Sequence, residues 1–252
     1  MRRLLLLVTA LLLLVAACSG GSLQEVTDTT VAAATTASEA SPAASVDVVV
    51  DADPALPDLL AQATEPWETD WTRRTVELDE LLLGIRVVDP RDAIRPLDAP
   101  RFSDLESTGD WLPDDQPGVV VEVEGEARFY PLTVLTRHEI VNDQIGAVPI
   151  SVTYCPLCNT AVVFDRRLDD ETLRLGVSGL LRKSDMVMWD DATTSLWQQV
   201  NGEGIVGTHA GRELTIIASR TMSLGAFGEA HPDGRALSQD QEFGSTYLVN
   251  PY

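Results

Sequence analysis

The sequence predicts an α+β domain made mostly of antiparallel strands, forming a sheet or a barrel, with one or two short helices. Two observations carry this prediction. Beyond residue 170, short runs rich in Val, Ile, Leu and Trp recur between Gly, Asp, Asn and Thr residues, the pattern of short antiparallel strands. Residues 119–130 form apolar runs on either side of Gly125, with alternation on the first, which predicts a β-hairpin turning at that glycine.

The N-terminus resembles a bacterial lipoprotein signal peptide, residues 1–17. Arg2 and Arg3 precede an apolar run over residues 4–15 that is short for a membrane span, and small residues stand before Cys18. We therefore expect Cys18 to carry diacylglycerol with acyl chains such as palmitate, and to anchor the protein on the extracytoplasmic face of the cell membrane. An ordinary secretory peptide or an uncleaved anchor is the alternative.

Residues 18–66 are rich in Ala, Thr, Ser, Asp, Glu and Pro without a sustained period. Such a segment buries too little apolar surface to offset the entropy of ordering it, so we expect a disordered tether. Residues 46–50 could still pair as a strand, and residues 54–63 could form a helical turn or two. One folded domain is expected over residues 67–252, with its core at about 85–252.

The expected elements of the domain follow in order. Residues 82–88 are expected to form its first strand, and the proline-punctuated residues 91–102 a surface loop. After the hairpin, Pro131 suits the first turn of a helix over residues 131–139. A second helix is expected over residues 221–230, with Thr221 as its N-cap. Further strands are expected over 150–154, 159–164, 173–178, 186–189, 195–200, 205–206 and 214–217.

The charge of the chain limits its partners. It has 39 acidic residues against 18 basic ones, whereas affinity for nucleic acid depends on clustered Lys and Arg. We therefore expect no nucleic-acid partner, and take the negative charge to keep an exported protein soluble. Whether a protein or a small molecule is bound stays open.

The segment Cys155-Pro156-Leu157-Cys158 contains two of the three cysteines in the chain. Two thiols separated by two residues can form a disulfide, hold one edge of a metal site, or exchange electrons with another dithiol. A thioredoxin fold is not expected, because that fold needs a helix starting at the motif and a later cis-proline. Here residues 159–164 have strand composition, and no proline occurs between Pro156 and Pro232.

A metal at this motif would need ligands from elsewhere in the chain, because the second half of a zinc ribbon is missing. Cys155, Cys158, His138 and His231 are the principal candidates, while His209, Met186, Met188 and Asp185 are further ones. Sulfur with His and Met outside the cytoplasm suggests copper, and an aspartate in the shell suggests zinc. The alternative for each histidine is a structural role in a turn or at a helix end. The alternative for the two methionines is packing in the core.

A family resemblance covers about two thirds of the chain, from Asp92 to Tyr252. It is carried by short motifs, namely 130–132 (Tyr-Pro-Leu), 138–143 (His-Glu-Ile-Val-Asn-Asp), 152–158, 176–180, 184–185, 190, 194–198, 205–207, 214 and 231–232. On these residues the chain resembles the DUF3179 family, a domain of unknown function. The resemblance implies no activity, and it leads us to expect some further residues after Tyr252.

Three hypotheses follow from the residues. The favoured one is a lipid-anchored protein with a thiol or metal site, for copper or zinc, centred on Cys155 and Cys158. The second is a binding or assembly module in which these cysteines form a structural disulfide. The third is an envelope enzyme with Cys155 as nucleophile and His138 as base, with Cys158 and Glu139 as further catalytic candidates. Whether the protein is an enzyme stays open.

Overall fold

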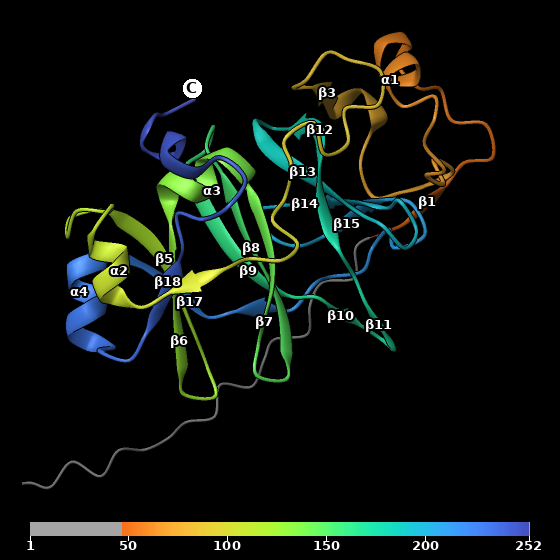
Figure 1. Ribbon diagram of the computed structural model, residues 1–252. Coiled ribbons are helices and arrows are strands. Elements are labelled where there is room, and N and C mark those ends of the chain that lie inside the picture. The colour runs from red at the N-terminus through yellow and green to blue at the C-terminus, as the bar shows by residue number, and fades with distance from the viewer. Residues whose placement is uncertain (1–46, 252) are drawn as a thin grey trace, which may run out of the picture. The chain divides into compact units, whose positions relative to one another are not determined.

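The structure is a computed structural model that describes residues 47–251, and it confirms the predominantly antiparallel fold (Figure 1). The signal peptide, Cys18 and residues 19–46 of the expected tether lie outside the described residues. Within them the strands form three main sheets and one small hairpin, accompanied by four short α-helices.

The first sheet has seven strands, all antiparallel to their neighbours. Its two longest strands, β12 (Leu175–Arg182) and β13 (Asp185–Asp190), form a hairpin whose turn contains Lys183 and Ser184 with positive φ. In spatial order its strands are β1 (Val49–Val50), β2 (Arg73–Arg74), β15 (Gly204–Val206), β14 (Leu196–Gln198), β13 (Asp185–Asp190), β12 (Leu175–Arg182) and β3 (Leu81–Leu83).

The second sheet has four antiparallel strands and contains the cysteine motif. In spatial order they are β16 (Ile216–Ile217), β9 (Thr160–Asp165), β8 (Val148–Cys155) and β7 (Ile140–Ile145). A separate small hairpin, β10 (Arg167–Leu168) and β11 (Glu171–Thr172), follows β9.

The third sheet has five strands and contains the predicted hairpin around Gly125. Its strands are β17 (Ser219–Ser223), β5 (Pro117–Val123), β6 (Glu126–Pro131), β18 (Arg235–Leu237) and β4 (Phe102–Ser103). The pairing of β18 with β6 is parallel, and the other pairings are antiparallel. Glu124 and Gly125 both have positive φ, as the tight hairpin turn requires.

Strand β8 is buried on both of its faces. Its apolar residues Ile150, Val152 and Tyr154 pack with residues of β5, β6 and β7 in one core cluster. Cys155, on the opposite face, belongs to a second cluster together with residues of β12, β13 and β14. The second sheet therefore lies between the other two, as Figure 1 shows for β7, β8 and β9.

Four short helices accompany the sheets, where one or two were expected. They are α1 (Asp58–Ala63), α2 (Leu105–Gly109), α3 (Leu132–His138) and α4 (Leu224–Ala230), with short 3-10 helices at Leu78–Glu80 and Gly244–Leu248. The prediction for α3 is confirmed. The prediction for α4 placed its start too early: Thr221 belongs to β17, and Ser223 is the N-cap that accepts from the Ala226 N–H.

The expected first strand over residues 82–88 is largely wrong. Strand β3 ends at Leu83, and the following residues form bends, with Val87 and Val88 exposed. Gly84 and Ile85 both donate their N–H groups to the Gly179 carbonyl. Because two successive amides share one acceptor, the strand ladder stops there despite the apolar composition of the segment.

The expected tether also differs from the structure over residues 47–66. Strand β1 pairs with β2, and helix α1 buries Leu60 in a cluster with Trp67, Val76 and Leu78. The hydrophobic pattern of the segment does not reveal that α1 packs on the domain. In so short a helix only Leu60 and Ala63 are buried, and Leu59 points to solvent. Ordered structure therefore begins well before residue 67.

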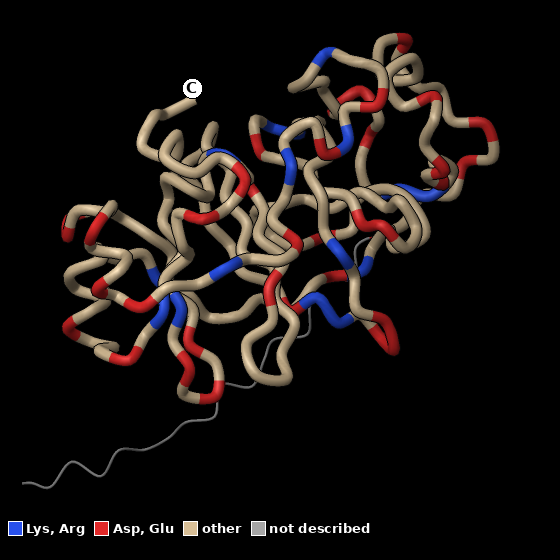
Figure 2. The backbone as a smooth tube through the Cα atoms, viewed as in Figure 1, with Lys and Arg blue, Asp and Glu red and all other residues tan. Residues whose placement is uncertain are grey.

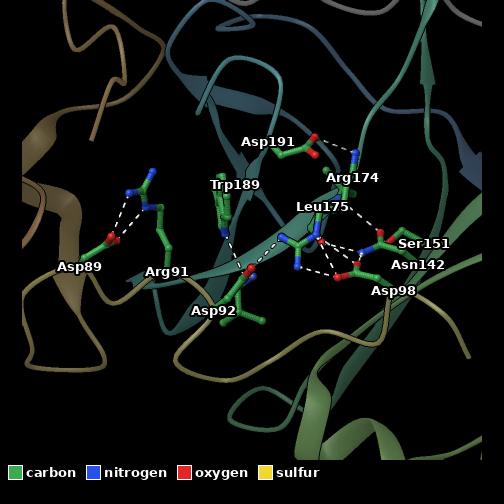
Figure 3. A network of polar contacts seen from close by, with 11 residues as sticks. Asp89, Arg91, Asp92, Asp98, Asn142, Ser151, Arg174, Leu175, Trp189 and Asp191 are labelled. Carbon is green, nitrogen blue, oxygen red and sulfur yellow. Dashed lines mark hydrogen bonds and ion pairs between the residues drawn. The ribbon is translucent and has the colours of Figure 1, made fainter. Parts of the chain in front are cut away.

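Arg174 joins the segment after α1 to the sheets (Figure 3). Its guanidinium forms ion pairs with Asp92 at 2.7 Å and with Asp98 at 2.9 Å. Asp92 also accepts from the Trp189 indole, and Asp98 from the Asn142 amide. The loop over residues 91–102 is thereby held against both β12 and β7.

Charged residues are mixed along the chain (Figure 2). Several arginines lie beside carboxylates, including the pairs Arg128–Asp143 and Arg212–Asp169. No helix within residues 47–251 is long and apolar enough to cross a membrane.

The burial of α1 gives a direct test of where the folded domain begins. Leu60→Ala should lower the free energy of unfolding by about 2–5 kcal/mol, because it leaves a cavity among buried side chains. The matched variant Leu59→Ala, at a side chain that is 66% exposed, should change it by less than about 0.5 kcal/mol. Urea unfolding followed by circular dichroism measures both values, and equal stabilities would show that α1 does not belong to the folded domain.

Candidate functional site

The two cysteines stand at the turn between β8 and β9. Cys155 ends β8 and pairs with Thr160, the first residue of β9, so Pro156 to Asn159 form the turn. Asn159 has φ 51°, a left-handed conformation that Asn tolerates better than most residues, and its side chain accepts from the Tyr154 hydroxyl at 2.9 Å. The turn therefore directs the Cys155 and Cys158 side chains to one place.

Asp185 completes this cluster from the first sheet. It opens β13 directly after the turn at Lys183 and Ser184, which brings its carboxylate to the tip of the cysteine hairpin. The ligand atoms of Cys155, Cys158 and Asp185 all lie within 4.8 Å of one another, and Cys158 Sγ is 3.3 Å from Asp185 Oδ1. It is the one such group of His, Cys, Asp or Glu found within residues 47–251.

The two sulfurs differ in their surroundings. Cys155 is 1% exposed and Cys158 is partly exposed, and both are free thiols. Burial raises the pKa of the Cys155 thiol to about 12, and a hydrogen bond with the Cys158 side chain adds to this, while the backbone N–H groups of Cys158 and Met186 act in the opposite direction. In the absence of a nearby positive charge, Cys155 is therefore held as a neutral thiol.

Asp185 is buried, at 6% exposed, yet one of its oxygens is left for a ligand. Oδ2 accepts from Gln198 Nε2 at 2.5 Å and from the Val200 N–H at 3.0 Å. Oδ1 faces Cys158. This division of roles leaves one oxygen of Asp185, Oδ1, available to a ligand beside the two sulfurs.

A series of hydrogen-bonded side chains lies beside Cys158. Its sulfur lies 2.9 Å from Thr160 Oγ1, which donates to Gln199 Oε1 at 3.1 Å. Gln199 Nε2 in turn donates to Thr153 Oγ1 at 2.9 Å. Because the Thr160 hydroxyl hydrogen is used on Gln199, Thr160 faces the thiol as an acceptor.

The structure does not bring His138 to the sulfurs. Its imidazole is fully buried at the end of α3, where Nδ1 lies 2.7 Å from the Arg95 carbonyl and Nε2 lies 2.6 Å from the Tyr247 hydroxyl. Burial lowers the pKa of His138. The expected ligand set and the expected Cys155–His138 catalytic pair are both wrong on this point, since both ring nitrogens bond the loop and the C-terminal segment.

The other histidines are also elsewhere. His231 follows α4, with its ring against Phe227 and its Nε2 4.0 Å from Glu122. His209 packs on the Trp197 ring. Met186 and Met188 lie in the buried cluster that contains Cys155, in the core-packing role considered for them.

Glu139, a further catalytic candidate, has a backbone role next to the cysteine strand. Glu139 ends α3 with φ 58°, and its carbonyl accepts from the Tyr154 N–H, so its backbone joins the helix to β8. The sequence places both cysteines at the end of the strand over residues 150–154, where a sheet meets solvent, which predicts that they lie at the rim of the main pocket. Two of the larger cavities, of about 430 and 500 Å³, are instead lined by residues of β5–β17 and by residues around Trp111 and Ser238.

Comparison with known proteins identifies the family of residues 91–252. A family model described as a protein of unknown function, DUF3179, matches residues 91–252. The chain belongs to the DUF3179 family. The match includes both cysteines, Asp185 and the two glutamines, whereas β1, α1, β2 and β3 precede it. Neither the curated proteins nor the solved structures gave a match.

From its sequence position alone Asp185 was a minor candidate ligand, and the roles of Thr160, Gln198 and Gln199 were not apparent. One signal was present in the sequence. Gln198 and Gln199 follow Trp197 in a segment with strand composition, and buried amides require partners. The pattern could not show that those partners lie on β8, β9 and β13.

The burial of Cys155 predicts a slow, strongly pH-dependent thiol. In a metal-free Cys158→Ser variant, alkylation of Cys155 at pH 8 should be at least about 10-fold slower than that of a cysteine peptide, because burial keeps the pKa of Cys155 above the peptide value of about 8.5 and leaves less thiolate to react. Its rate should still rise between pH 9 and 10, where the peptide levels off. Mass spectrometry that localises the label, and so excludes Cys18, measures both. Alkylation as fast as the peptide would contradict this placement.

Proposed function

We propose that the protein binds Zn²⁺ through Cys155, Cys158 and Asp185. The observation that carries this proposal is the 3.3 Å separation between Cys158 Sγ and Asp185 Oδ1, from two different sheets. Tetrahedral zinc with bonds of about 2.3 Å to sulfur and about 2.0–2.2 Å to oxygen places such ligand atoms roughly 3.5 Å apart. The cluster is thus close to the size that zinc requires.

The donor set favours zinc over copper. A carboxylate oxygen is a hard ligand, whereas Cu(I) prefers thiolate and thioether sulfur. Copper was suggested by Met and His candidates, but Met186 and Met188 pack in the core and the three histidines have other neighbours. Two thiolates and one carboxylate match a zinc site with three protein ligands.

Three protein ligands leave the fourth tetrahedral position for water or a substrate atom. Structural zinc sites usually have four protein ligands, and catalytic sites have three. The partial exposure of Cys158 gives solvent access to this side of the cluster. The site is therefore suited to metal-dependent chemistry or to metal transfer more than to a purely structural metal.

The metal would also settle the ionisation of the thiols. Cys155 remains protonated without a nearby positive charge, because burial raises its pKa. A bound cation favours the deprotonated form of its coordinating thiols. Because protons compete with the metal for these sulfurs, the affinity for the metal falls at low pH. The backbone N–H groups of Cys158 and Met186, which act on Cys155, are suited to stabilise the resulting thiolate.

The binding site is tested by measuring Zn²⁺ affinity in competition with a chromophoric chelator under reducing conditions. Cys155→Ser and Cys158→Ser should each weaken binding by roughly 100-fold or more, beyond the 10- to 100-fold that loss of an outer-shell partner costs. Asp185→Asn should weaken it by at least about 10-fold. The Co²⁺-substituted wild type should show a thiolate-to-cobalt charge-transfer band that each serine variant reduces.

Two matched controls separate this ligand set from the one first expected. Asp191→Asn removes an exposed carboxylate from the next turn, and His231→Gln removes a histidine. Neither should change the affinity. Full binding by the serine variants would exclude the site, and loss of binding on His231→Gln would restore the histidine ligand set.

We also propose that the protein is anchored to the extracytoplasmic face of the cell membrane through a lipid on Cys18. The support is the arrangement of Arg2-Arg3, the apolar run and the small residues before Cys18. The acidic chain is poorly suited to bind an anionic membrane surface by charge alone.

Cys18→Ser should release the protein from the membrane fraction or leave it unprocessed, because the acyl chains supply the membrane affinity. Fractionation followed by a high-salt wash and immunoblotting measures this. Ser19→Ala, a neighbouring change that keeps the cysteine, is the control. Retention of the Cys18→Ser variant on washed membranes, at its processed mass, would refute lipid anchoring.

A further inference from the structure

A series of side-chain contacts connects Asp185, in the family domain, with the segment that precedes this domain. We infer that Gln198, Arg182 and Glu80 are positioning residues for Asp185, and that residues before position 91 thereby set the metal affinity. This inference rests on the proposed zinc site. It concerns residues that do not touch the metal.

The first link is Gln198. Its Nε2 donates to Asp185 Oδ2 at 2.5 Å, and the Val200 N–H donates to the same oxygen at 3.0 Å. Two donors on one oxygen prevent rotation of the carboxylate and keep Oδ1 toward Cys158. Without the Gln198 amide, only the Val200 N–H would hold Oδ2, and the carboxylate could then turn so that Oδ1 moves away from Cys158.

The second link is Arg182, which determines which way the Gln198 amide faces. Its NH1 lies 3.2 Å from Gln198 Oε1. Arginine can only donate and an ionised carboxylate can only accept. A single orientation of the amide satisfies both neighbours: oxygen toward Arg182 and nitrogen toward Asp185.

The third link is Glu80, at the end of the 3-10 helix Leu78–Glu80. Its Oε2 lies 2.9 Å from Arg182 NH2, in a pair where the Arg182 side chain is 14% exposed. Strand β3 follows directly and pairs with β12, so that Leu81 stands opposite Arg182. The pairing of these strands thus keeps Glu80 in reach of the guanidinium.

Glu80 and β3 lie before residue 91, where the family match begins. The family domain supplies Asp185, Gln198 and Arg182, while the preceding segment supplies the carboxylate that holds Arg182. The N-terminal segment therefore contributes one ion pair, from Glu80 to Arg182. The hydrogen bonds of Gln198 within the family domain connect that ion pair to Asp185.

The test measures Zn²⁺ affinity in the full chain carrying Gln198→Met or Glu80→Gln. Gln198→Met keeps the volume, removes the amide and should weaken binding by roughly 10-fold, the lower range for an outer-shell partner. Glu80→Gln acts two residues further out and should weaken it by about 2- to 5-fold, the size of a partly exposed ion pair. Glu77→Gln, at an exposed carboxylate on the same segment, should have no effect, and Glu80→Asp should recover part of the affinity.

A positioning role is separated from a structural one by repeating Gln198→Met and Glu80→Gln in an Asp185→Asn background. If both residues act through the Asp185 carboxylate, their effects on affinity should largely disappear there. Wild-type binding that depends on the cysteines, together with unchanged affinity in both variants, would overturn the positioning chain and leave the zinc site intact. So would losses that persist in the Asp185→Asn background. If the wild type binds no Zn²⁺, the proposed function itself fails.

Discussion

The burial of β8 on both faces is the constraint on which the rest of the structure depends. An ordinary antiparallel strand with one solvated face could leave its polar residues in water. Here Ser151, Thr153 and Cys155 form a row that is at most 1% exposed. Buried polar groups are costly unless they are bonded. The neighbouring sheets must therefore supply partners for this row.

Those partners determine how the first and second sheets fit together. Asn142 accepts from Ser151 and bonds the Leu175 backbone through both ends of its amide. Gln199 donates to Thr153, and its own N–H bonds the Met186 carbonyl. Because side chains alternate along a strand, a shift of β8 by one residue would move this row out of reach and place Ile150 and Val152 against the amides. The same contacts that satisfy the polar row bring Asp185 to the cysteine turn.

Local patterns predicted some of this fold and not the rest. The hairpin around Gly125, helix α3 and the strands beside the cysteines depend on neighbouring residues, and the sequence identified them. Residues 82–88 have strand composition, but strand formation ended at Gly84 because its partner carbonyl on Gly179 is shared. His138 precedes the cysteine motif by a short stretch of chain, which favours it as a partner of Cys155, whereas its orientation is set by Tyr247, more than 100 residues away. Asp185 was a weaker candidate because its approach to Cys158 depends on contact between two sheets.

The two cysteines are unequal, and this inequality decides how the site can be reached. Cys155 ends a central strand, where burial suppresses its ionisation and two backbone N–H groups act on its sulfur. Cys158 lies in the turn beside the exposed Leu157, with its sulfur between Thr160 and Asp185. A solvent-borne ligand or oxidant therefore meets Cys158 first, while Cys155 becomes accessible only if the turn moves. In the proposed zinc site, Cys155 is therefore the fixed ligand, and Cys158 is the ligand through which exchange with solvent occurs.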